Sequence, residues 1–382
     1  MKRVCIIAGE ASGDLHGASL VKALKERGEP IQFVGLGGPL LQALDVEMVY
    51  PPPLNVVGFT EVFFKISHLF KAYQEVKKVL RTKKPDLLIL IDYPDMNLRL
   101  AKAARKAGVP VLFYISPQVW AWRAGRVKTI ARFVNRMAVI LPFEVAFYQA
   151  RGVSVEFVGH PLMDRLKMKA SESPGDGPKF QPELSGTETI IGLLPGSRPT
   201  EIKGILPVLM ETAVLLTQRY GPKVRFVLPV ANTISSEMIR EQLRPYQDQG
   251  VSVTVFTGDS FDILKKCHQA IVASGTVTLE SAILGLPIQI VYKVSPVNYW
   301  IAKRLIDIPY VGLVNWVAGE KVIPEYIQDE ATPTSIMQGA VKYLEDPDFT
   351  QRIREKLFEV RQRLGEPGAS QRVARMAWEM MH

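Results

Sequence analysis

The segment from residue 92 to residue 97 brings two carboxylates and an amide close together. Asp92, Asp95 and Asn97 follow directly on an apolar run, and Pro94 stiffens the loop that holds them. A carboxylate placed beside a reacting hydroxyl can take its proton as a general base. Asp95 and Asn97 can equally well cap a helix that starts here. The spacing predicts one of these two roles and leaves both open.

A second polar group follows residues 270–273, which have the apolar pattern of a buried parallel strand. A turn and a helix come next, and their polar residues are Ser274, Gly275, Thr276, Thr278 and Glu280. The N–H groups and the positive dipole end of a helix start attract a diphosphate. Glu280 would repel phosphate, but its carboxylate can accept two hydrogen bonds from a ribose diol. The alternative is an ordinary strand–turn–helix in which Ser and Thr only cap the helix.

Two other turns join a glycine to an expected helix start. The first covers residues 9–14, and its candidate ligand-binding residues are Gly9, Glu10, Ser12 and Gly13. It lacks the G-x-G-x-x-G spacing of a dinucleotide site, but its glycines let a ligand approach the backbone closely. Glu10 and Asp14 bring carboxylates to the carboxyl end of the sheet, where such folds bind ligands. The second turn contains Gly196, Ser197 and Arg198. Arg198 can bind a phosphate there, unless it is a solvated side chain in an ordinary turn.

Two segments carry more aromatic residues than a core requires. Trp120 and Trp122 stand with Arg123 in a loop, where they can face a sugar or an acyl chain, although tryptophan is usually buried. Residues 54–85 contain a helical apolar stripe that is sufficient for burial. The aromatic residues partly outside this stripe, which lie among lysines, are Phe59, Phe63, Phe64 and Phe70. They predict either a membrane-contacting patch or additional core.

Strand and helix patterns alternate along almost the whole chain. This order is typical of parallel sheets covered by helices, so we predict an α/β fold. Residues 167–187, rich in Pro, Gly, Ser and charge, form an expected linker. We expect a Rossmann-like, doubly wound domain at residues 1–166 and another at residues 188–345, with a cleft between them. The helical residues 346–382 would pack back on the first domain or on a partner chain, which would make a homodimer.

Composition limits the class of protein. The 382 residues carry a net charge of +9 with scattered Lys and Arg, which suits an anionic ligand or membrane surface better than a nucleic-acid arm. Cys5 and Cys267 lie in or beside apolar runs, so we expect buried, reduced thiols in a cytoplasmic protein. No apolar run approaches the roughly 18 residues of a membrane span. We therefore expect a protein that is not integral to a membrane.

Six short segments together resemble the lipid-A-disaccharide synthase family, whose members are glycosyltransferases of the GT-B fold. They are GEASGD at 9–14, IDYPDMN at 91–97, SPQVWAWR at 116–123, LLPGSR at 193–198, SGTVTLE at 274–280 and PYVGLVN at 309–315. The segments follow in order through both halves of the chain. The Trp-Ala-Trp segment together with GEASGD is far more specific than a single glycine loop.

The resemblance implies an inverting sugar transfer between two lipids. 2,3-Diacylglucosamine would pass from its UDP derivative to 2,3-diacylglucosamine 1-phosphate, giving the β-1,6-linked disaccharide 1-phosphate and UDP. Because the anomer inverts, the acceptor 6-hydroxyl attacks from the face opposite UDP, and this attack needs one base. We expect Asp95 to be the base, with Asp92 and Glu10 as the alternatives.

The resemblance also implies a donor site in the second half. Arg198 and the helix start at residues 274–278 would stabilise the departing diphosphate. Glu280 would hold the ribose, and the backbone near Asn315 the uracil. No Asp-x-Asp pair marks a metal-bridged diphosphate, because the acidic loop is Asp-x-x-Asp and lies in the other half. We therefore expect a reaction without a metal ion or another cofactor.

Both implied substrates carry acyl chains and so reside largely in a bilayer. Because the sequence has no expected membrane span, the enzyme must either bind the membrane surface reversibly or collect its lipids in some other way. We therefore expect a cytoplasmic enzyme that binds peripherally to the cytoplasmic face of the inner membrane, through the Phe-rich patch.

Two other functions fit parts of the sequence. A UDP-sugar 2-epimerase has a similar frame and UDP site, but it needs neither the Phe-rich segment nor a lipid acceptor, and it converts its UDP-sugar alone. A nucleic-acid-binding module would suit the positive charge, but Lys and Arg form no single stripe and no recognised binding motif occurs. We therefore expect no nucleic-acid partner.

Overall fold

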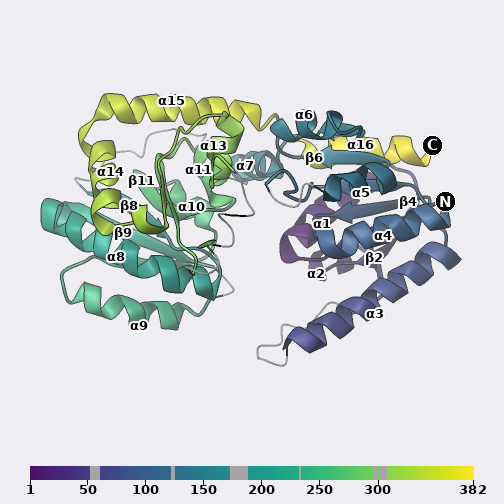
Figure 1. Cartoon of the computed structure of the whole chain (residues 1–382), viewed down its shortest axis with the longest axis horizontal. Helices are drawn as coiled ribbons and strands as arrows, with labels where there is room; N and C mark the ends of the chain where they lie inside the picture. Colours follow the sequence, from purple (N-terminus) through teal and green to yellow (C-terminus); the bar gives the residue numbers. More distant parts are fainter. Residues whose placement is uncertain are drawn as a thin grey trace. The chain divides into compact units, whose positions relative to one another are not determined.

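The computed structural model divides the chain into two compact units, each with its own parallel sheet (Figure 1). Met1–Lys167 and Leu364–His382 form the first unit, and Met168–Arg363 form the second. The predicted α/β class with two doubly wound sheets is confirmed. The backbone is described for residues 1–51, 61–121, 125–172, 188–231, 234–295, 299–300, 304 and 308–382, and the side chains for all of these except 61–66 and 168–172. Residues 173–187 of the expected linker thus lie outside the described residues.

The first unit is built on a seven-stranded sheet. Its strands are β1 (Lys2–Ala8), β2 (Ile31–Leu36), β3 (Glu47–Met48), β4 (Leu87–Ile91), β5 (Val111–Tyr114), β6 (Arg136–Val139) and β7 (Val155–Phe157). They pair in parallel in the order β3-β2-β1-β4-β5-β6-β7. The central strands are continuous apolar runs, because helices cover both of their faces; β4, with the sequence LLILI, is completely buried.

The helices of the first unit cover this sheet in two layers (Figure 1). They are α1 (Ala11–Lys25), α2 (Pro39–Gln42), α3 (Glu61–Thr82), α4 (Pro94–Ala107), α5 (Arg126–Phe133), α6 (Phe143–Gln149), α7 (Pro161–Glu172), which continues into the second unit, and α16 (Ala369–Met381). α3, α4, α5 and α6 bury side chains such as Val76, Leu100 and Ile130 on one face. α1 and α16 pack together on the other face, where Leu20 and Met376 are buried.

The second unit is built on a six-stranded parallel sheet. Its strands are β8 (Thr189–Leu194), β9 (Val224–Val230), β10 (Val253–Thr257), β11 (Gln269–Ala273), β12 (Ile288–Tyr292) and β13 (Glu325–Ile327). Its helices are α8 (Pro199–Tyr220), η1 (Gly221–Lys223), α9 (Ser236–Gln247), α10 (Ser260–Leu264), α11 (Val277–Ile283), α13 (Leu313–Ala318), η2 (Gln328–Glu330), α14 (Pro333–Glu345) and α15 (Pro347–Arg363). The strand order is β10-β9-β8-β11-β12-β13, and α8 packs against α14.

We expected the helices of residues 346–382 to pack together on the first domain or on a partner chain. They are instead divided between the two units. α15 packs against α11, α13 and α14, so the second unit continues to Arg363 rather than ending near residue 345. The chain then returns to the first unit at Leu364, and α16 completes the core there. α16 therefore packs on the first unit of its own chain.

Two general expectations concern the cysteines and the membrane. Cys5 and Cys267 are free, buried thiols, and burial raises the pKa of each thiol to about 12, so neither is reactive near neutral pH.

Within the part of the chain that the structure describes, none of the helices has the length and apolar character needed to cross a bilayer.

Each sheet reverses its strand order at one place. This switch point lies between β1 and β4 in the first sheet and between β8 and β11 in the second. Ala8 pairs with Ile91, and Leu194 pairs with Val272, so the loops that follow these strands start side by side at the carboxyl edge of their sheet. Ligands of doubly wound α/β proteins bind at this position. All four loops contain a predicted site segment.

Candidate active site

The loop after β4 contains a strained turn. Asp92 and Tyr93 have φ angles of 48° and 45°, in the left-handed region that non-glycine residues rarely occupy. Each such residue costs about 1–3 kcal/mol, so the surroundings must hold the turn. The buried side chain of Asn97 does so, because its amide donates to the carbonyl oxygens of Ile91, at 3.2 Å, and Asp92, at 2.7 Å. Asn97 therefore braces the loop, and the N-cap residue of α4 is Tyr93.

The strained turn places Asp92 beside Glu10, from the loop after β1. Burial raises the pKa of the half-buried Asp92 carboxyl, and the negative charge of Glu10 raises it further, while the backbone N–H of Tyr93 lowers it. Two of the three candidate bases therefore lie near each other at the switch point of the first sheet. A carboxylate whose charged form is disfavoured binds a proton more strongly, which favours abstraction of a proton from a hydroxyl.

Asp95 lies in a different environment, in the first turn of α4. Its side chain is 75% exposed and forms an ion pair with Arg126, the first residue of α5. The ion pair orients the Asp95 carboxylate at a helix N-terminus, where negative charge is favourable. Asp95 is therefore accessible to a substrate hydroxyl, whereas Asp92 is half-buried.

The glycine turn after β1 fits closely against the acidic loop. A Cβ atom on Gly9 would lie 2.5 Å from Cγ of Tyr93, so only glycine leaves room for this ring. Gly13 is buried in the first turn of α1, and the side chain of Ser12 is exposed. The tight fit of Gly9 is therefore structural, and Ser12 is the accessible polar side chain of this turn.

Asp14, at the end of the GEASGD segment, has a structural role. Its carboxylate is 4% exposed and accepts hydrogen bonds from the backbone N–H groups of Gly38, Leu40 and Leu41, at 2.8, 3.0 and 3.1 Å. These bonds satisfy donors at the start of α2. We expected Asp14, like Glu10, to offer a carboxylate at the ligand-binding edge, but its oxygens are occupied by these backbone N–H groups, so Asp14 fixes the neighbouring loop instead.

A buried carboxylate that the sequence did not single out holds the tryptophan loop. Glu144, in the first turn of α6, is 1% exposed. One oxygen accepts a hydrogen bond from the Trp120 indole N–H at 3.2 Å, and the other accepts one from the backbone N–H of Leu141 at 3.1 Å. Trp120 also lies edge-on to Phe143, with ring centroids 4.9 Å apart. The predicted residues of this loop that lie outside the described residues are Trp122 and Arg123.

Glu144 should make the stability of the fold depend on pH. Burial raises the pKa of this carboxyl from its ordinary 4.5 to about 7. Between these values the folded state holds a proton that the unfolded state has released, so stability falls by about 3 kcal/mol as the pH rises through this window. Glu144→Gln keeps the shape but cannot ionise, so its free energy of unfolding should fall less.

Denaturant unfolding of wild type and Glu144→Gln at about pH 5 and about pH 7.5 measures this difference. An equal fall in both proteins would show that another group causes the pH dependence.

The loop after β11 leads into α11 with its predicted polar residues in place. Ser274 donates its hydroxyl hydrogen to the carbonyl oxygen of Val311, and Thr278 donates to that of Gly275, each at 2.8 Å. A Cβ atom on Gly275 would meet no described atom within 4 Å, so a ligand can approach this backbone closely. Thr276 is the N-cap residue of α11. The turn is therefore internally ordered and open beside Gly275.

Glu280 lies one turn into α11 and is nearly buried. It is 8% exposed, and one carboxylate oxygen accepts a hydrogen bond from the Ser260 hydroxyl at 3.2 Å. A buried carboxylate needs such donors, because losing water is costly for a charge. Ser260 begins α10, 20 residues earlier in the chain, so no local pattern links it to Glu280.

The turn after β8 is closed by its own helix. One oxygen of Glu201, in the first turn of α8, accepts hydrogen bonds from the backbone N–H groups of Ser197, at 2.9 Å, and Arg198, at 3.2 Å. The other oxygen accepts one from the Arg198 guanidinium at 2.9 Å. Gly196 has a φ angle of 114°, and a Cβ atom there would clash with Glu201. The backbone of this turn already holds a carboxylate, so the 78% exposed Arg198 side chain is the group that can reach a phosphate.

The loop before α13 is fixed by two buried polar residues. Asn315 is fully buried, and its amide donates to the carbonyl oxygen of Ile323 and to Glu325, each at 2.9 Å. Glu325 also accepts hydrogen bonds from the backbone N–H groups of Val311, at 2.9 Å, and Gly312, at 2.8 Å. The side chain of Asn315 therefore supports the loop. The backbone N–H and C=O groups around it are the groups of this loop that can bind a nucleobase.

The structure brings the predicted residues together within each unit. Glu10 lies near enough to Asp92 at the first switch point for its charge to raise the Asp92 pKa, and Ser274 contacts the loop before α13 at the second. Among the described residues, no group of three or more His, Cys, Asp and Glu side chains is arranged to hold a metal ion.

Comparison with known proteins covers the whole chain. The family model of Lipid-A-disaccharide synthetase matches residues 4–377. The lipid-A-disaccharide synthase of Geobacter metallireducens is 48% identical over 381 residues, which cover 100% of this chain and 97% of the relative.

Solved structures of similar fold are much more distant in sequence. The UDP-GlcNAc 2-epimerase from Neisseria meningitidis, bound to UDP-GlcNAc, has a TM-score of 0.65 at 14% identity and covers 99% of this chain and 100% of its own. MurG from Acinetobacter baumannii has a TM-score of 0.60 at 15% identity, with the same coverage of 99% and 100%. These likenesses show the fold alone. The match to the family model over nearly the whole chain, together with 48% identity to a full-length relative, shows that the chain belongs to the lipid-A-disaccharide synthase family.

Proposed function

We propose that this chain, a glycosyltransferase of lipid A biosynthesis, transfers 2,3-diacylglucosamine from UDP-2,3-diacylglucosamine to 2,3-diacylglucosamine 1-phosphate. The products are the β-1,6-linked disaccharide 1-phosphate and UDP. One observation carries the proposal: the two switch points hold chemically different sites. Carboxylates follow β1 and β4, and a hydroxyl-rich helix start with Glu280 follows β11. The first suits activation of a hydroxyl, and the second suits a nucleoside diphosphate.

The proposed reaction is a single displacement. The acceptor 6-hydroxyl attacks the anomeric carbon from the face opposite UDP, and Asp95 takes the proton of this hydroxyl as the new C–O bond forms. The bond to the diphosphate breaks, and its electron pair leaves with UDP. Asp92 and Glu10 are the alternatives for the base. Arg198 and the start of α11 stabilise the negative charge that develops on the diphosphate.

The transfer can be tested with the purified chain and the two lipids. We expect UDP release only when donor and acceptor are both present, with an equal amount of disaccharide 1-phosphate. A UDP-sugar 2-epimerase, the alternative, would convert the donor without an acceptor. Conversion of the donor alone would therefore contradict the proposed function.

The same assay tests the proposed independence of metal ions. A chelator should leave the transfer rate unchanged, because we assign stabilisation of the leaving diphosphate to Arg198 and a helix start rather than to a metal ion. Loss of activity with chelator, followed by recovery on addition of magnesium or manganese, would contradict this part of the mechanism.

Glu280→Ala should weaken UDP binding, because we propose that Glu280 accepts hydrogen bonds from the ribose diol. Each hydrogen bond to a charged acceptor contributes about 1.5–3 kcal/mol, so the Kd for UDP should rise by about tenfold or more. The ribose lies away from the reacting carbon, so KM should rise more than kcat falls. Titration calorimetry with UDP and steady-state kinetics measure both effects.

Glu188→Ala is the matched control for this variant. The Glu188 side chain is 42% exposed and pairs with Arg225, and Glu188 directly precedes β8, so it lies at the edge of the sheet opposite the proposed UDP site. Its loss should leave UDP affinity unchanged. A Glu280→Ala variant that bound UDP as tightly as this control would rule out the ribose assignment.

We also propose that the enzyme is cytoplasmic and binds peripherally to the cytoplasmic face of the inner membrane. Phe70 supports this proposal, because its side chain in α3 is 61% exposed and the neighbouring Leu69 is 39% exposed. Phe59 lies outside the described residues, and the side chains of Phe63 and Phe64 lie outside the described side chains. A homodimer stays a prediction, which light scattering tests.

A further inference from the structure

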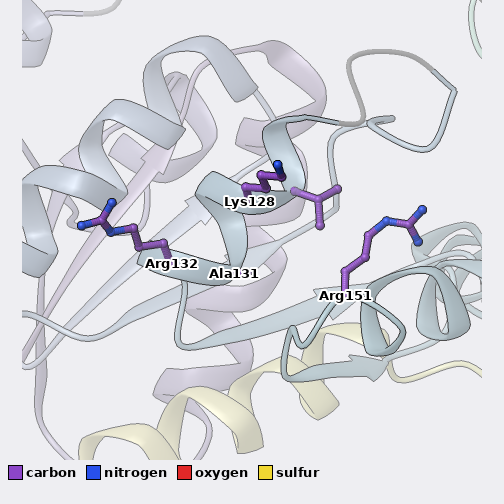
Figure 2. Close-up of a pocket in the computed structure, with 5 residues that line it drawn as sticks. Lys128, Ala131, Arg132 and Arg151 are labelled. Atoms are coloured by element: carbon purple, nitrogen blue, oxygen red, sulfur yellow. The ribbon is translucent and has the colours of Figure 1, made fainter.

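A pocket on the first unit is lined mainly by cations. It has a volume of about 480 Å³ and lies between α5 and the chain just after α6 (Figure 2). The residues that line it are Val127, Lys128, Ala131, Arg132 and Arg151. Three of these five residues are positively charged and none is negatively charged, so the pocket presents a positive potential to solvent. The proposed transfer reaction uses none of them.

The cations of the pocket come from two elements. Lys128, Ala131 and Arg132 are three and four residues apart and therefore share one side of α5. The Arg151 guanidinium lies 4.0 Å from the ring centroid of Phe147 and donates to the Phe147 carbonyl oxygen at 2.9 Å. Figure 2 shows the Arg132 guanidinium on the far side of α5 from Arg151. Lys128 on α5 and Arg151 after α6 thus line the same pocket from two different elements.

A phosphate group attached to an organic molecule matches this pocket. Its several acceptor oxygens and negative charge can satisfy a guanidinium and an ammonium at the same time. Val127 and Ala131 add apolar lining, which suits a phosphate ester better than inorganic phosphate. The volume of about 480 Å³ is within the range of small-molecule sites.

The helix layer around the pocket has the composition of a surface that meets anionic lipid. α3, α4, α5 and α6 cover the same face of the sheet (Figure 1). The exposed residues of α4 are Asp95, Arg99, Lys102, Arg105 and Lys106. Asp95, the single acid in the sequence of α4, is paired with Arg126. α3 adds the exposed apolar side chains of Leu69 and Phe70. This layer is therefore complementary to an anionic bilayer in both charge and apolar character.

We propose that the pocket binds the phosphate headgroup of an anionic phospholipid. The headgroup forms a second membrane contact, in addition to the one proposed for α3. Two separate contacts on one helix layer fix the orientation of the first unit on the bilayer, which a single contact cannot do. The inference rests on the peripheral membrane binding proposed above, and it adds the ligand class and the residues Lys128 and Arg151.

Sedimentation with lipid vesicles tests the pocket. Wild type and Lys128→Ala/Arg151→Ala are compared on phosphatidylcholine vesicles and on vesicles that also contain phosphatidylglycerol. Each cation near an anionic surface strengthens binding about fivefold, so the double variant should bind the anionic vesicles about 25-fold more weakly, whereas its binding to neutral vesicles should be almost unchanged. Arg132→Ala should lose less vesicle affinity than the double variant, because it removes one lining cation and its guanidinium lies across α5 from that of Arg151 (Figure 2).

Three controls accompany this experiment. Lys22→Ala/Lys223→Ala removes the same amount of charge from exposed positions outside this helix layer. Phe70→Ser reports on the α3 contact separately. Transfer activity in detergent should be the same for wild type and the pocket variant, because no bilayer is present. If the pocket variant lost no more vesicle affinity than the Lys22→Ala/Lys223→Ala control, net charge would explain the loss and the pocket would be excluded.

The remaining outcomes separate the pocket from the membrane proposal. A wild type that does not sediment with anionic vesicles would overturn both, whereas vesicle binding that depends on Phe70 but not on Lys128 and Arg151 would overturn the pocket alone. Thermal shift with inorganic phosphate and with glycerol 3-phosphate examines a soluble ligand. Stabilisation of the wild type but not of the pocket variant, with equal vesicle binding by both, would mean that the ligand is a soluble phosphate and not a lipid.

Discussion

Asp95→Asn should lower kcat by about 10²–10⁴, because the amide keeps the shape of the side chain but cannot take the proton of the acceptor hydroxyl. Folding should survive, since the Asp95 side chain is 75% exposed. UDP affinity should also be unchanged, because we assign UDP to the second unit. Steady-state turnover measures the expected loss, thermal unfolding shows whether the variant is folded, and titration with UDP measures its UDP affinity.

Asp92→Asn is the matched comparison for this prediction. Asparagine tolerates the left-handed backbone, so it fits the turn in which Asp92 has a φ angle of 48°. If Asp95 is the base, Asp92→Asn should lower kcat much less than Asp95→Asn does. Near-normal turnover of Asp95→Asn together with a large loss in Asp92→Asn would move the role to Asp92. In that case the acidic limb of the kcat/KM profile should lie above the usual range of an aspartate, because burial and Glu10 raise the pKa of Asp92.

Arg198→Ala should lower kcat by about 10²–10³, the usual effect of removing a donor that stabilises charge in the transition state. Negative charge on the diphosphate grows as the glycosidic bond breaks, so the guanidinium should matter more for turnover than for binding of the donor. KM for the donor should therefore change much less than kcat. Steady-state kinetics with varied donor concentration separates the two effects.

Substitutions at Glu201 and Arg198 control for the shape of the turn. Arg198→Lys keeps the charge but loses the planar guanidinium, so its turnover should lie between those of wild type and Arg198→Ala. Glu201→Gln keeps an oxygen that can accept from the backbone N–H groups of the turn, and it should retain most of the activity. If Glu201→Gln were as slow as Arg198→Ala, the role of Arg198 would be to shape the turn.

The architecture could be predicted because local patterns repeat along the chain. Runs such as LLILI in β4 lack polar residues, and this marks them as strands covered on both faces. Glycine and polar residues follow these runs and mark the turns into helices. Once the strands alternate with helices, parallel pairing follows, and the loops after β1, β4, β8 and β11 come to the carboxyl edge of a sheet.

The roles of individual polar residues were harder to predict, because most depend on contacts between distant parts of the chain. Trp120 and Glu144 are 24 residues apart, and Asn315 and Glu325 are 10 residues apart. Sequence spacing carries no information about such pairs. Glu201 is different, since it follows Arg198 by three residues, the spacing of a capping box, and could have been recognised.

The strain after β4 also escapes prediction from sequence. Aspartate tolerates a left-handed backbone better than most residues, but tyrosine does not, so Tyr93 gives no local signal for its φ angle of 45°. The turn exists because the buried Asn97 and the close fit at Gly9 stabilise it.

The return of the chain to the first unit has a consequence for synthesis on the ribosome. α16 supplies Val373 and Met376 to the core of the first unit, yet it follows the second unit in the chain and is made after it. The whole of Met168–Arg363, roughly 200 residues, is translated between the two parts of this unit, which takes about 10–40 s at about 5–20 residues per second. Throughout this interval the apolar surface that α16 later covers is exposed to solvent or to a chaperone. The first unit therefore cannot finish folding until the second unit has been synthesised.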